Sequence, residues 1–313
     1  MARAFVFPGQ GSQAVGMGRE LCQAFEAARL VLEEVDEALD QRLSKLMFEG
    51  PERELTLTEN AQPALMAVSI AAYRVLAKDA ALALPQGAAC VAGHSLGEYS
   101  ALAAAGTFML ADAARLLKAR GQAMQKAVPV GEGAMAALLG VDLAKAEEIV
   151  KDAAEGEVLA VANDNAPGQV VVSGHKSAVE RAVKLAGEHG PARALMLPVS
   201  APFHCSLMQP AADAMAEALS KVAMEAPAVP LVANVTASAV SDVLAIRNLL
   251  VAQVTARVRW RECVLAMKKD GVDTIVEIGW GKVLSGLTRR IAREINAVSI
   301  QTPADIDAFL KTV

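Results

Sequence analysis

A glycine-flanked serine at a strand-to-helix corner limits the folds open to this chain more than any other feature. A short apolar run ends in Gly93-His94-Ser95-Leu96-Gly97, and an alanine-rich helical pattern follows at once. At such a corner the serine takes a strained backbone conformation that lifts its hydroxyl above the sheet, and the small glycines let strand and helix approach closely. Ser95 is therefore a candidate nucleophile. The competing interpretation is a glycine-rich turn in which Ser95 is an ordinary helix N-cap.

The remainder of the chain alternates between apolar runs and helical patterns, which predicts an α/β fold. Alternation of this kind is typical of a mostly parallel sheet covered by helices on both faces. With 313 residues, 54% of them hydrophobic, the chain can bury a large core. We expect one large α/β-hydrolase-like domain. Its strands are expected at 4–7, 88–93, 231–235 and 274–278, and its helices at 20–39, 61–77, 96–105 and 111–127.

A middle segment has a different order of elements and predicts a second, smaller unit. Its strands are expected at 134–141, 158–162, 169–173 and 194–197, with helices at 143–154 and 177–189 and a turn-rich stretch at 163–168. This βαββαβ order is typical of a ferredoxin-like subdomain. We therefore expect a small ferredoxin-like subdomain at 128–197, inserted into a discontinuous catalytic domain formed by 1–127 and 198–313.

Charge, hydropathy and cysteine content argue against several functions. The formal net charge is −5 and the isoelectric point is about 5.5, without the basic excess of nucleic-acid-binding proteins. No apolar run reaches the roughly 18 residues of a membrane span, and Pro8 and Gly9 interrupt the first apolar stretch, so no signal peptide is expected. The four cysteines are far apart and form no CxxC pair, which predicts reduced thiols and no zinc site. We expect a cytoplasmic protein that binds neither nucleic acid nor membrane.

A nucleophilic serine needs a base, and the chain has four histidines. The side chain of His94 leaves the strand end in another direction, whereas His175 and His189 are expected at the surface. His204 is the candidate base, because it lies in a non-helical stretch where the chain rejoins the large domain, and such loops collect catalytic groups. On the residues alone, a loop histidine without a catalytic role remains the alternative.

No acidic residue completes a triad. In an α/β-hydrolase the serine is followed by an aspartate or glutamate, and then by a histidine near the end of the chain. Here no acid stands at an obvious strand-end motif between Ser95 and His204 outside the 128–197 insert, and a long stretch of chain follows His204. The pattern predicts a serine–histidine dyad whose histidine is oriented by a main-chain or amide oxygen.

Seven segments, taken in order, resemble the malonyl-CoA:acyl carrier protein transacylases of type II fatty acid synthesis. Together they span essentially the whole chain, and the set is far more specific than any one short motif. The segments are 7–13, 93–101, Arg120-Gly121 with Met124, 163–174, 202–204, Gln253 near Trp260, and 279–286. The chain departs from the family's pattern at Trp280, between Gly279 and Gly281, so the shape of this loop does not follow from the resemblance.

The resemblance implies roles for five residues around the serine. Ser95 would be acylated and His204 would be its base. Gln10 and the Leu96 N–H would form the oxyanion hole, and Gln253 would hold the histidine in the right tautomer through an oxygen. Without the resemblance, Gln10 would be interpreted as a turn amide and Gln253 as a glutamine on a helix surface.

The resemblance also implies that Arg120 binds the free carboxylate of a malonyl group. A guanidinium gives a carboxylate two parallel charge-assisted hydrogen bonds, which a lysine cannot copy. The match at Arg120-Gly121 selects this arginine over Arg115, and the competing interpretation is a solvated arginine. Phe203 suggests a pocket too crowded for a branched acyl group, which favours malonyl over methylmalonyl.

The implied function is transfer of malonyl from malonyl-CoA to the pantetheine thiol of acyl carrier protein, through a malonyl-serine, for fatty acid synthesis. No metal, nicotinamide or flavin is implied, and Gly9-Gln10-Gly11 lacks the spacing of a dinucleotide motif. Because acyl carrier proteins are acidic, a basic patch should rim the pocket. Its candidates, which are equally well explained as ordinary helix charges, are Lys282, Arg289 and Arg290.

For this protein we expect a monomer. Three other functions remain as alternatives. A serine esterase or thioesterase would pass the acyl group to water, but the missing acid and Arg120 argue against it. A non-catalytic subunit that binds carrier protein would form no covalent adduct. An excised acyltransferase domain of a polyketide synthase is disfavoured by the native-looking start at Met1 and close at Val313.

Overall fold

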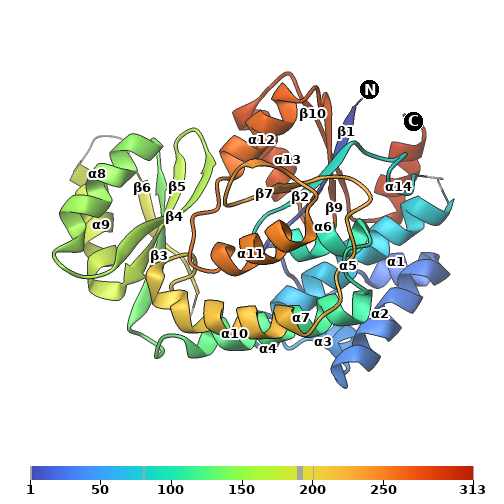
Figure 1. The fold of residues 1–313 in the computed structure, drawn as a ribbon, viewed down its shortest axis with the longest axis horizontal. Coiled ribbons are helices and arrows are strands. Elements are labelled where there is room, and N and C mark those ends of the chain that lie inside the picture. Colours follow the sequence, from blue (N-terminus) through green and yellow to red (C-terminus); the bar gives the residue numbers. More distant parts are fainter. Residues whose placement is uncertain (1, 80–81, 189–192, 200, 313) are drawn as a thin grey trace.

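Two sheets, one mostly parallel and one antiparallel, organise the protein (Figure 1). The computed structural model describes residues 2–79, 82–188, 193–199 and 201–312. Within these residues the larger sheet has six strands in the order β10-β9-β1-β2-β7-β8, and only β8 runs antiparallel to its neighbour. The bounds are β1 Arg3–Phe7, β2 Cys90–Gly93, β7 Leu231–Ala233, β8 Ser238–Val240, β9 Thr274–Ile278 and β10 Asn296–Ile300.

Helices cover both faces of the larger sheet. Successive side chains of its central strands point to opposite faces, so they pack into two different cores. Phe5 and Phe7 of β1 pack into the larger core, whereas Ala4 and Val6 pack into a second core with Trp260. The large-subdomain helices are α1 Arg19–Ala24, α2 Glu26–Leu39, α3 Leu43–Glu49, α4 Glu52–Leu55, α5 Thr58–Asp79, α6 Gly97–Ala104, α7 Leu110–Lys126, α10 Gln209–Ser220, α11 Val243–Gln253, α12 Trp260–Lys269, α13 Val283–Ile291 and α14 Pro303–Leu310, and a short 3₁₀ helix, η1, spans Ser206–Met208.

The smaller sheet has its own core, formed against α8 (Leu143–Ala154) and α9 (Lys176–Glu188). Its strands follow the order β4-β5-β3-β6, in which every neighbouring pair is antiparallel. The bounds are β3 Gly133–Leu139, β4 Leu159–Ala166, β5 Gln169–His175 and β6 Arg193–Met196. This order is that of a ferredoxin-like βαββαβ unit, so the predicted fold class is confirmed. The predicted boundaries at 127/128 and 197/198 stay a prediction.

Two of the predicted elements differ in the structure, and the strands β8 and β10 were not predicted. The sequence predicts a turn at 163–168, but Asn163–Ala166 continues β4, and only the bend into β5 remains outside a strand. The physical reason is tertiary: irregular pairing with β5 and a parallel bridge from Asn163 to Val258 of the large subdomain supply this polar segment with backbone partners. The helix expected at 20–39 is two helices, with extended backbone at Phe25 between them.

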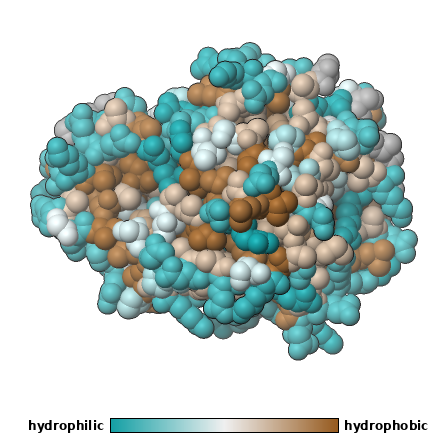
Figure 2. Space-filling view, in the orientation of Figure 1, coloured by the Kyte–Doolittle hydropathy of each residue, from teal (hydrophilic) through white to brown (hydrophobic). Residues whose placement is uncertain are grey.

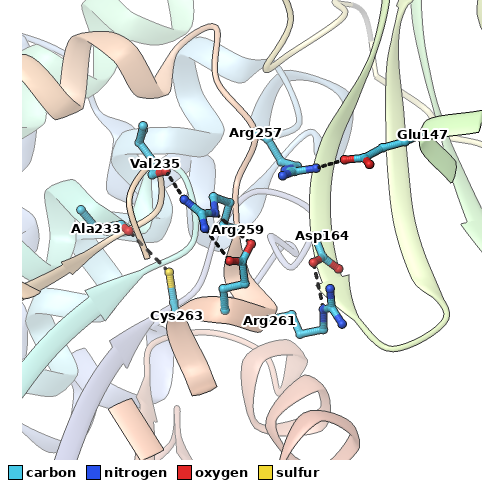
Figure 3. Close-up of polar contacts among 9 residues, drawn as sticks. Glu147, Asp164, Ala233, Val235, Arg257, Arg259, Arg261 and Cys263 are labelled. Atoms are coloured by element: carbon cyan, nitrogen blue, oxygen red, sulfur yellow. Dashed lines mark hydrogen bonds and ion pairs between the residues drawn. The ribbon is translucent and has the colours of Figure 1, made fainter. Parts of the chain in front are cut away.

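Main-chain and ionic contacts hold the small subdomain against the large one (Figure 3). The Asp164 N–H donates to Val258 O at 2.9 Å, which continues the bridge from β4. Arg261 Nε lies 2.9 Å from Asp164 Oδ2, and the side chain of Asp164 is only 1% exposed. Arg257 Nη1 reaches Glu147 Oε1 of α8 at 2.8 Å in a more exposed pair. The position of β4 is therefore fixed by residues outside its own sheet.

Apolar side chains also reach the surface of this protein. Figure 2 shows them gathered toward the middle of the visible face and on the small subdomain, with hydrophilic side chains around the rim. None of the helices in the described part of the chain is both long enough and apolar enough to span a bilayer.

Candidate active site

Ser95 lies at a tight corner between β2 and α6, and two glycines make that corner possible. A Cβ on Gly93 would lie 1.9 Å from the Gly97 carbonyl carbon, and a Cβ on Gly97 would lie 2.2 Å from Phe7 O. Any residue with a Cβ atom would clash with the backbone at either position. Ser95 itself has φ +53°, a left-handed conformation that non-glycine residues seldom adopt. The corner therefore projects the hydroxyl beyond the carboxyl end of the strand.

His204 lies within hydrogen-bond reach of the serine. Its Nε2 is 2.9 Å from Ser95 Oγ, and its Nδ1 is 2.9 Å from the main-chain oxygen of Gln253. A carbonyl oxygen accepts only, so Nδ1 carries the hydrogen and Nε2 is free to accept one from the serine. His204 also has a positive φ, +60°. The third member of the arrangement is thus a main-chain oxygen where a triad has a carboxylate.

The environment of His204 keeps its imidazole neutral. The side chain is buried, and burial together with the nearby Arg120 guanidinium lowers its pKa to about 3. A neutral imidazole is the form that can take a proton from a hydroxyl. The dyad is therefore ready to act as nucleophile and base at neutral pH without a carboxylate partner.

Arg120 is a buried cation that faces the serine. It lies on α7, is 1% exposed, and its Nη2 donates to Ser95 Oγ at 3.1 Å and to Gln253 Oε1 at 2.9 Å. Its Nη1 donates to Gln62 Oε1 at 2.8 Å. A Cβ at the next residue, Gly121, would lie 2.5 Å from Glu59 Cα, so this glycine allows α7 to pack closely on α5 and brings the arginine inward.

The arginine lacks a direct carboxylate partner among the described residues. Its contacts are the two glutamine oxygens, the serine hydroxyl and the ring of Tyr99, whose centroid lies 5.8 Å from Cζ. Burial lowers the pKa of Arg120, while Tyr99 and Glu98 act in the opposite direction. A buried guanidinium held only by neutral groups is a strong binding site for an incoming carboxylate.

These groups open into one cavity of about 410 Å³ between the two subdomains. The large subdomain contributes Ser95, His204 and Arg120 to its wall, together with other residues that include Gln10, Leu96, Gln62, His94 and Phe203. The small subdomain contributes Met135, Asn163, Asn165 and Val171. A second cavity of about 520 Å³ shares Gln10 and the segment 197–199 with it, so the two cavities adjoin.

The two predicted oxyanion donors lie beside the serine in different settings. The next three N–H groups along the chain, those of Gly97, Glu98 and Tyr99, donate to carbonyls three residues back. The Leu96 N–H precedes them, at the start of a helix, where donors lack intrahelical partners. Gln10 lines the cavity, and its Nε2 donates one hydrogen to Thr58 Oγ1 at 3.3 Å, which leaves the second N–H of the amide as the donor for an oxyanion.

Three residues of this site were not identified as functional from the sequence. Asn234, at the end of β7, accepts the Ser95 N–H at 2.8 Å and donates from Nδ2 to Gly93 O at 2.7 Å, which braces the corner. Glu98 is buried on α6, and burial raises its pKa to about 8. Gln62 is on α5. The sequence signal for Glu98 was a charged residue inside an alanine-rich helix beside the serine. The sequence held no signal for Gln62.

The other candidates have structural partners. His94 Nε2 lies 2.8 Å from Asn165 Oδ1, and His175 Nδ1 accepts the Val158 N–H at 2.9 Å. His189 lies outside the described residues. Arg289 donates to Ala297 O at 2.7 Å, and Arg290 donates to Pro167 O at 3.0 Å. Lys282 and Trp280 are not among the residues that line either cavity, and no group of metal-ligating side chains occurs in the described ranges.

Comparison with known proteins places this site in a family. The model of the acyl transferase domain family matches residues 4–302. The malonyl CoA-acyl carrier protein transacylase of Escherichia coli strain K12 is 46% identical over 98% of each chain. The chain therefore belongs to the acyl transferase family, and within it to the malonyl CoA-acyl carrier protein transacylases, as its sequence motifs indicated.

Solved structures agree with this assignment. The acyl-carrier-protein-S-malonyltransferase of Bartonella henselae is 56% identical, with a TM-score of 0.97 over 100% of this chain and 99% of its own. A malonyl-transacylase in complex with its type II PKS acyl-carrier protein is 41% identical, with a TM-score of 0.96 over 100% of both chains. The fold of the chain is thus shared over its whole length with proteins of this activity.

Proposed function

We propose that this chain transfers the malonyl group of malonyl-CoA to the pantetheine thiol of acyl carrier protein, through a malonyl ester on Ser95. The observation that carries the proposal is the contact of Ser95 Oγ with both His204 Nε2, at 2.9 Å, and Arg120 Nη2, at 3.1 Å. One hydroxyl is thus next to a neutral base and to a buried cation. A nucleophile in this setting is suited to an acyl group that carries a carboxylate.

In the first half-reaction, Ser95 Oγ attacks the thioester carbonyl while His204 Nε2 takes its proton. The main-chain oxygen of Gln253, 2.9 Å from Nδ1, holds the tautomer and stabilises the imidazolium that forms. Collapse of the tetrahedral intermediate breaks the C–S bond. The coenzyme A thiolate leaves with the proton from His204, and the malonyl group remains as an ester on Ser95.

Stabilisation of the tetrahedral oxyanion falls to the Leu96 N–H and to Gln10. The Leu96 N–H is fixed at the start of α6, so it costs no reorganisation when the charge develops. Gln10 donates one N–H to Thr58 and would offer its second N–H to the oxyanion. Removal of one such donor costs roughly 10²–10³ in rate in enzymes of this kind.

Arg120 receives the malonyl carboxylate. Its guanidinium is already turned toward Ser95 by the amide oxygens of Gln62 and Gln253. The carboxylate would therefore meet a preoriented fork and would displace the contact of the guanidinium with the Ser95 hydroxyl. With the carboxylate fixed, the ester carbonyl lies between the serine and the donor of Leu96. Phe203, which is mostly buried in the cavity wall, leaves little room for a branch on the acyl chain.

In the second half-reaction the acceptor thiol attacks the malonyl ester. His204 takes the thiol proton and returns it to Ser95 Oγ as the C–O bond breaks, which regenerates the free enzyme. The acceptor is the pantetheine thiol of an acyl carrier protein, as supported by the related malonyl-transacylase that was solved with its carrier protein. No cofactor other than the coenzyme A substrate enters either half-reaction. We propose a cytoplasmic location, which is supported by the free thiols of Cys22, Cys90, Cys205 and Cys263.

Intact-protein mass spectrometry tests the proposal directly. Incubation of the wild-type chain with malonyl-CoA should add one malonyl increment, and Ser95→Ala should abolish it. Addition of carrier protein with its pantetheine arm should then remove the increment from the wild type and place it on the carrier.

The same experiment separates the competing functions. Loss of the increment to water at the same rate with and without carrier protein would indicate a thioesterase. A chain that binds carrier protein but never gains an increment would be a non-catalytic binding subunit. Either outcome overturns the proposed transfer.

A further inference from the structure

Gln253 is hydrogen-bonded to three parts of the site at once. Its main chain accepts from His204, its Oε1 accepts from Arg120 at 2.9 Å, and its Nε2 donates to Ser95 O at 3.0 Å. The same Nε2 lies 2.6 Å from Glu98 Oε2. The side chain of Gln253 is fully buried, so these contacts, not solvent, decide how its amide is turned.

Only one orientation of this amide satisfies its neighbours. A guanidinium has donors and no acceptor, so Arg120 requires the oxygen of the Gln253 amide. A main-chain carbonyl accepts only, so Ser95 O requires the nitrogen. Glu98 lies on the nitrogen side and supplies a second acceptor there, at the shorter of the two distances. Glu98 therefore stabilises the orientation in which the Gln253 amide presents its oxygen to Arg120.

Glu98 is itself fixed on both sides. Its Oε1 accepts the main-chain N–H of Asn234, and its Oε2 accepts from Gln253. The side chain is 1% exposed, so water cannot replace either bond. Asn234 also accepts the Ser95 N–H, which ties the position of Glu98 to the nucleophile corner. Both neighbours are donors, so they favour the ionised form and lower the pKa of Glu98 against the effect of burial, and in that form the carboxylate is a rigid acceptor one amide away from Arg120.

We propose that Glu98 is a positioning residue for acyl-group selection, acting through the Gln253 amide on the Arg120 guanidinium. The proposal rests on the proposed malonyl transfer, because it assigns to Arg120 the substrate carboxylate. Without the Glu98 acceptor, the Gln253 amide loses the shorter of its two Nε2 hydrogen bonds, so it is held less firmly and can more readily turn its NH₂ group toward Arg120. The guanidinium then loses one of the two amide oxygens that aim its fork. His204 keeps its partner, because that partner is the Gln253 main chain.

The substitution Glu98→Gln tests this chain of contacts at nearly constant volume. The introduced amide has one acceptor atom for two donor neighbours, so either Asn234 N–H or Gln253 Nε2 must face an NH₂ group. We expect the ratio of malonyl to acetyl loading on Ser95 to fall at least about tenfold, which is the size expected for one lost hydrogen bond to a charged group. The loss should lie in KM for malonyl-CoA, while the acetyl loading rate at saturation changes little.

The chain offers a matched control in Glu277 on β9. Glu277 is also fully buried, and its two oxygens accept main-chain N–H bonds, from Leu284 at 3.0 Å and from Ser285 at 2.8 Å. Glu277→Gln therefore imposes the same chemical change away from Arg120. It should lower the thermal midpoint and leave the malonyl-to-acetyl ratio unchanged. Equal ratios in wild type, E98Q and E277Q would overturn the proposal.

A second variant covers the case in which E98Q does not fold. The exchange E98Q/Q253E restores the donor–acceptor match between these two positions, because the NH₂ group of the amide introduced at position 98 faces a carboxylate and its oxygen faces Asn234 N–H, while Ser95 O loses its side-chain donor. The carboxylate at position 253 then pairs with Arg120, so we expect a folded protein that loads acetyl but has lost its preference for malonyl. Recovery of wild-type preference in this exchange would contradict the proposal. A wild-type chain that gains no malonyl increment would instead refute the proposed function.

Discussion

The two walls of the active-site cavity are built in different ways. On the large-subdomain side, Ser95, His204, Arg120 and Gln253 are joined to one another by hydrogen bonds and are buried. On the small-subdomain side, the lining residues come from a separate sheet, and Asn165 Oδ1 lies 2.8 Å from His94 Nε2 across the cavity. The reactive groups and the groups that orient them therefore belong to one wall, and the other wall closes over them.

This difference shows that separate sets of contacts hold the two walls in place. Backbone corners and buried hydrogen bonds fix the reactive wall within its own subdomain. The closing wall is fixed from outside its sheet, by the main-chain contact of β4 with Val258 and by the ion pair of Asp164 with Arg261, which Figure 3 shows. Changes in the first wall should alter chemistry and acyl choice, and changes at the junction should alter stability first.

The largest expected effect comes from Arg120→Ala on the reactive wall. The loss of a bidentate, buried carboxylate contact should lower kcat/KM for malonyl-CoA by about 10² or more, and acetyl loading should persist or rise. Loading of Ser95 from each coenzyme A ester, followed by mass spectrometry, measures both rates. Arg115→Ala, on the exposed side of the same helix, is the control and should leave both rates unchanged. An unaltered malonyl preference in Arg120→Ala would place carboxylate recognition elsewhere.

The pH profile gives the next effect and tests the electrostatics of the same wall. Because the free-enzyme pKa of His204 is lowered to about 3, its base form persists as the pH falls. A histidine with an ordinary pKa of about 6.5 would lose about 30-fold in kcat/KM between pH 8 and pH 5. We expect only a small loss for this chain over that range, with circular dichroism to confirm that it stays folded.

The same measurement on a variant identifies the cause of the shift. Burial lowers the pKa of His204 first and the Arg120 guanidinium lowers it further, so Arg120→Ala should move the acid limb of acetyl loading to higher pH. An acid limb near pH 6.5 in the wild type would contradict the neutral, buried histidine.

The smallest effect is expected at the subdomain junction. Arg261→Ala leaves the buried Asp164 carboxylate without its ion-pair partner, which should lower the free energy of unfolding by about 1–3 kcal/mol. Arg257→Ala breaks a more exposed pair with Glu147 and should cost less than about 1 kcal/mol. Urea unfolding measures both. A shift in the malonyl-to-acetyl ratio in Arg261→Ala, without loss of stability, would show that the closing wall also selects the acyl group.

Local patterns in the sequence predicted most of the fold. Short apolar runs located β1, β2 and β9, because those strands are buried on both faces and contain mostly apolar residues. The sequence failed at Asn163–Ala166, where polar residues form a strand only because β5 and Val258 satisfy their backbone. The edge strands β8 and β10 were also missed, because a few residues at the edge of a sheet carry a weak pattern.

Part of the candidate site could be predicted in the same way. The corner at Ser95 has a local signature, because the close approaches at Gly93 and Gly97 forbid any other residue type. The absence of an acid in the right order predicted that an oxygen of another kind would orient His204, and the structure has the Gln253 main chain in that place. A main-chain partner leaves no trace in residue identity, so the family resemblance, and not the residue pattern, pointed to Gln253.

The sequence alone determined that this chain forms an α/β fold around a strained serine, and its motifs placed it in a family. The tertiary structure decided which residues surround that serine. Asn234, Glu98 and Gln62 come from three separate elements, and they gain their roles only where β7, α6 and α5 meet the end of β2. The physical reason is that hydrogen bonds between distant segments depend on burial and on orientation to within a few tenths of an ångström, which folding fixes and residue type does not.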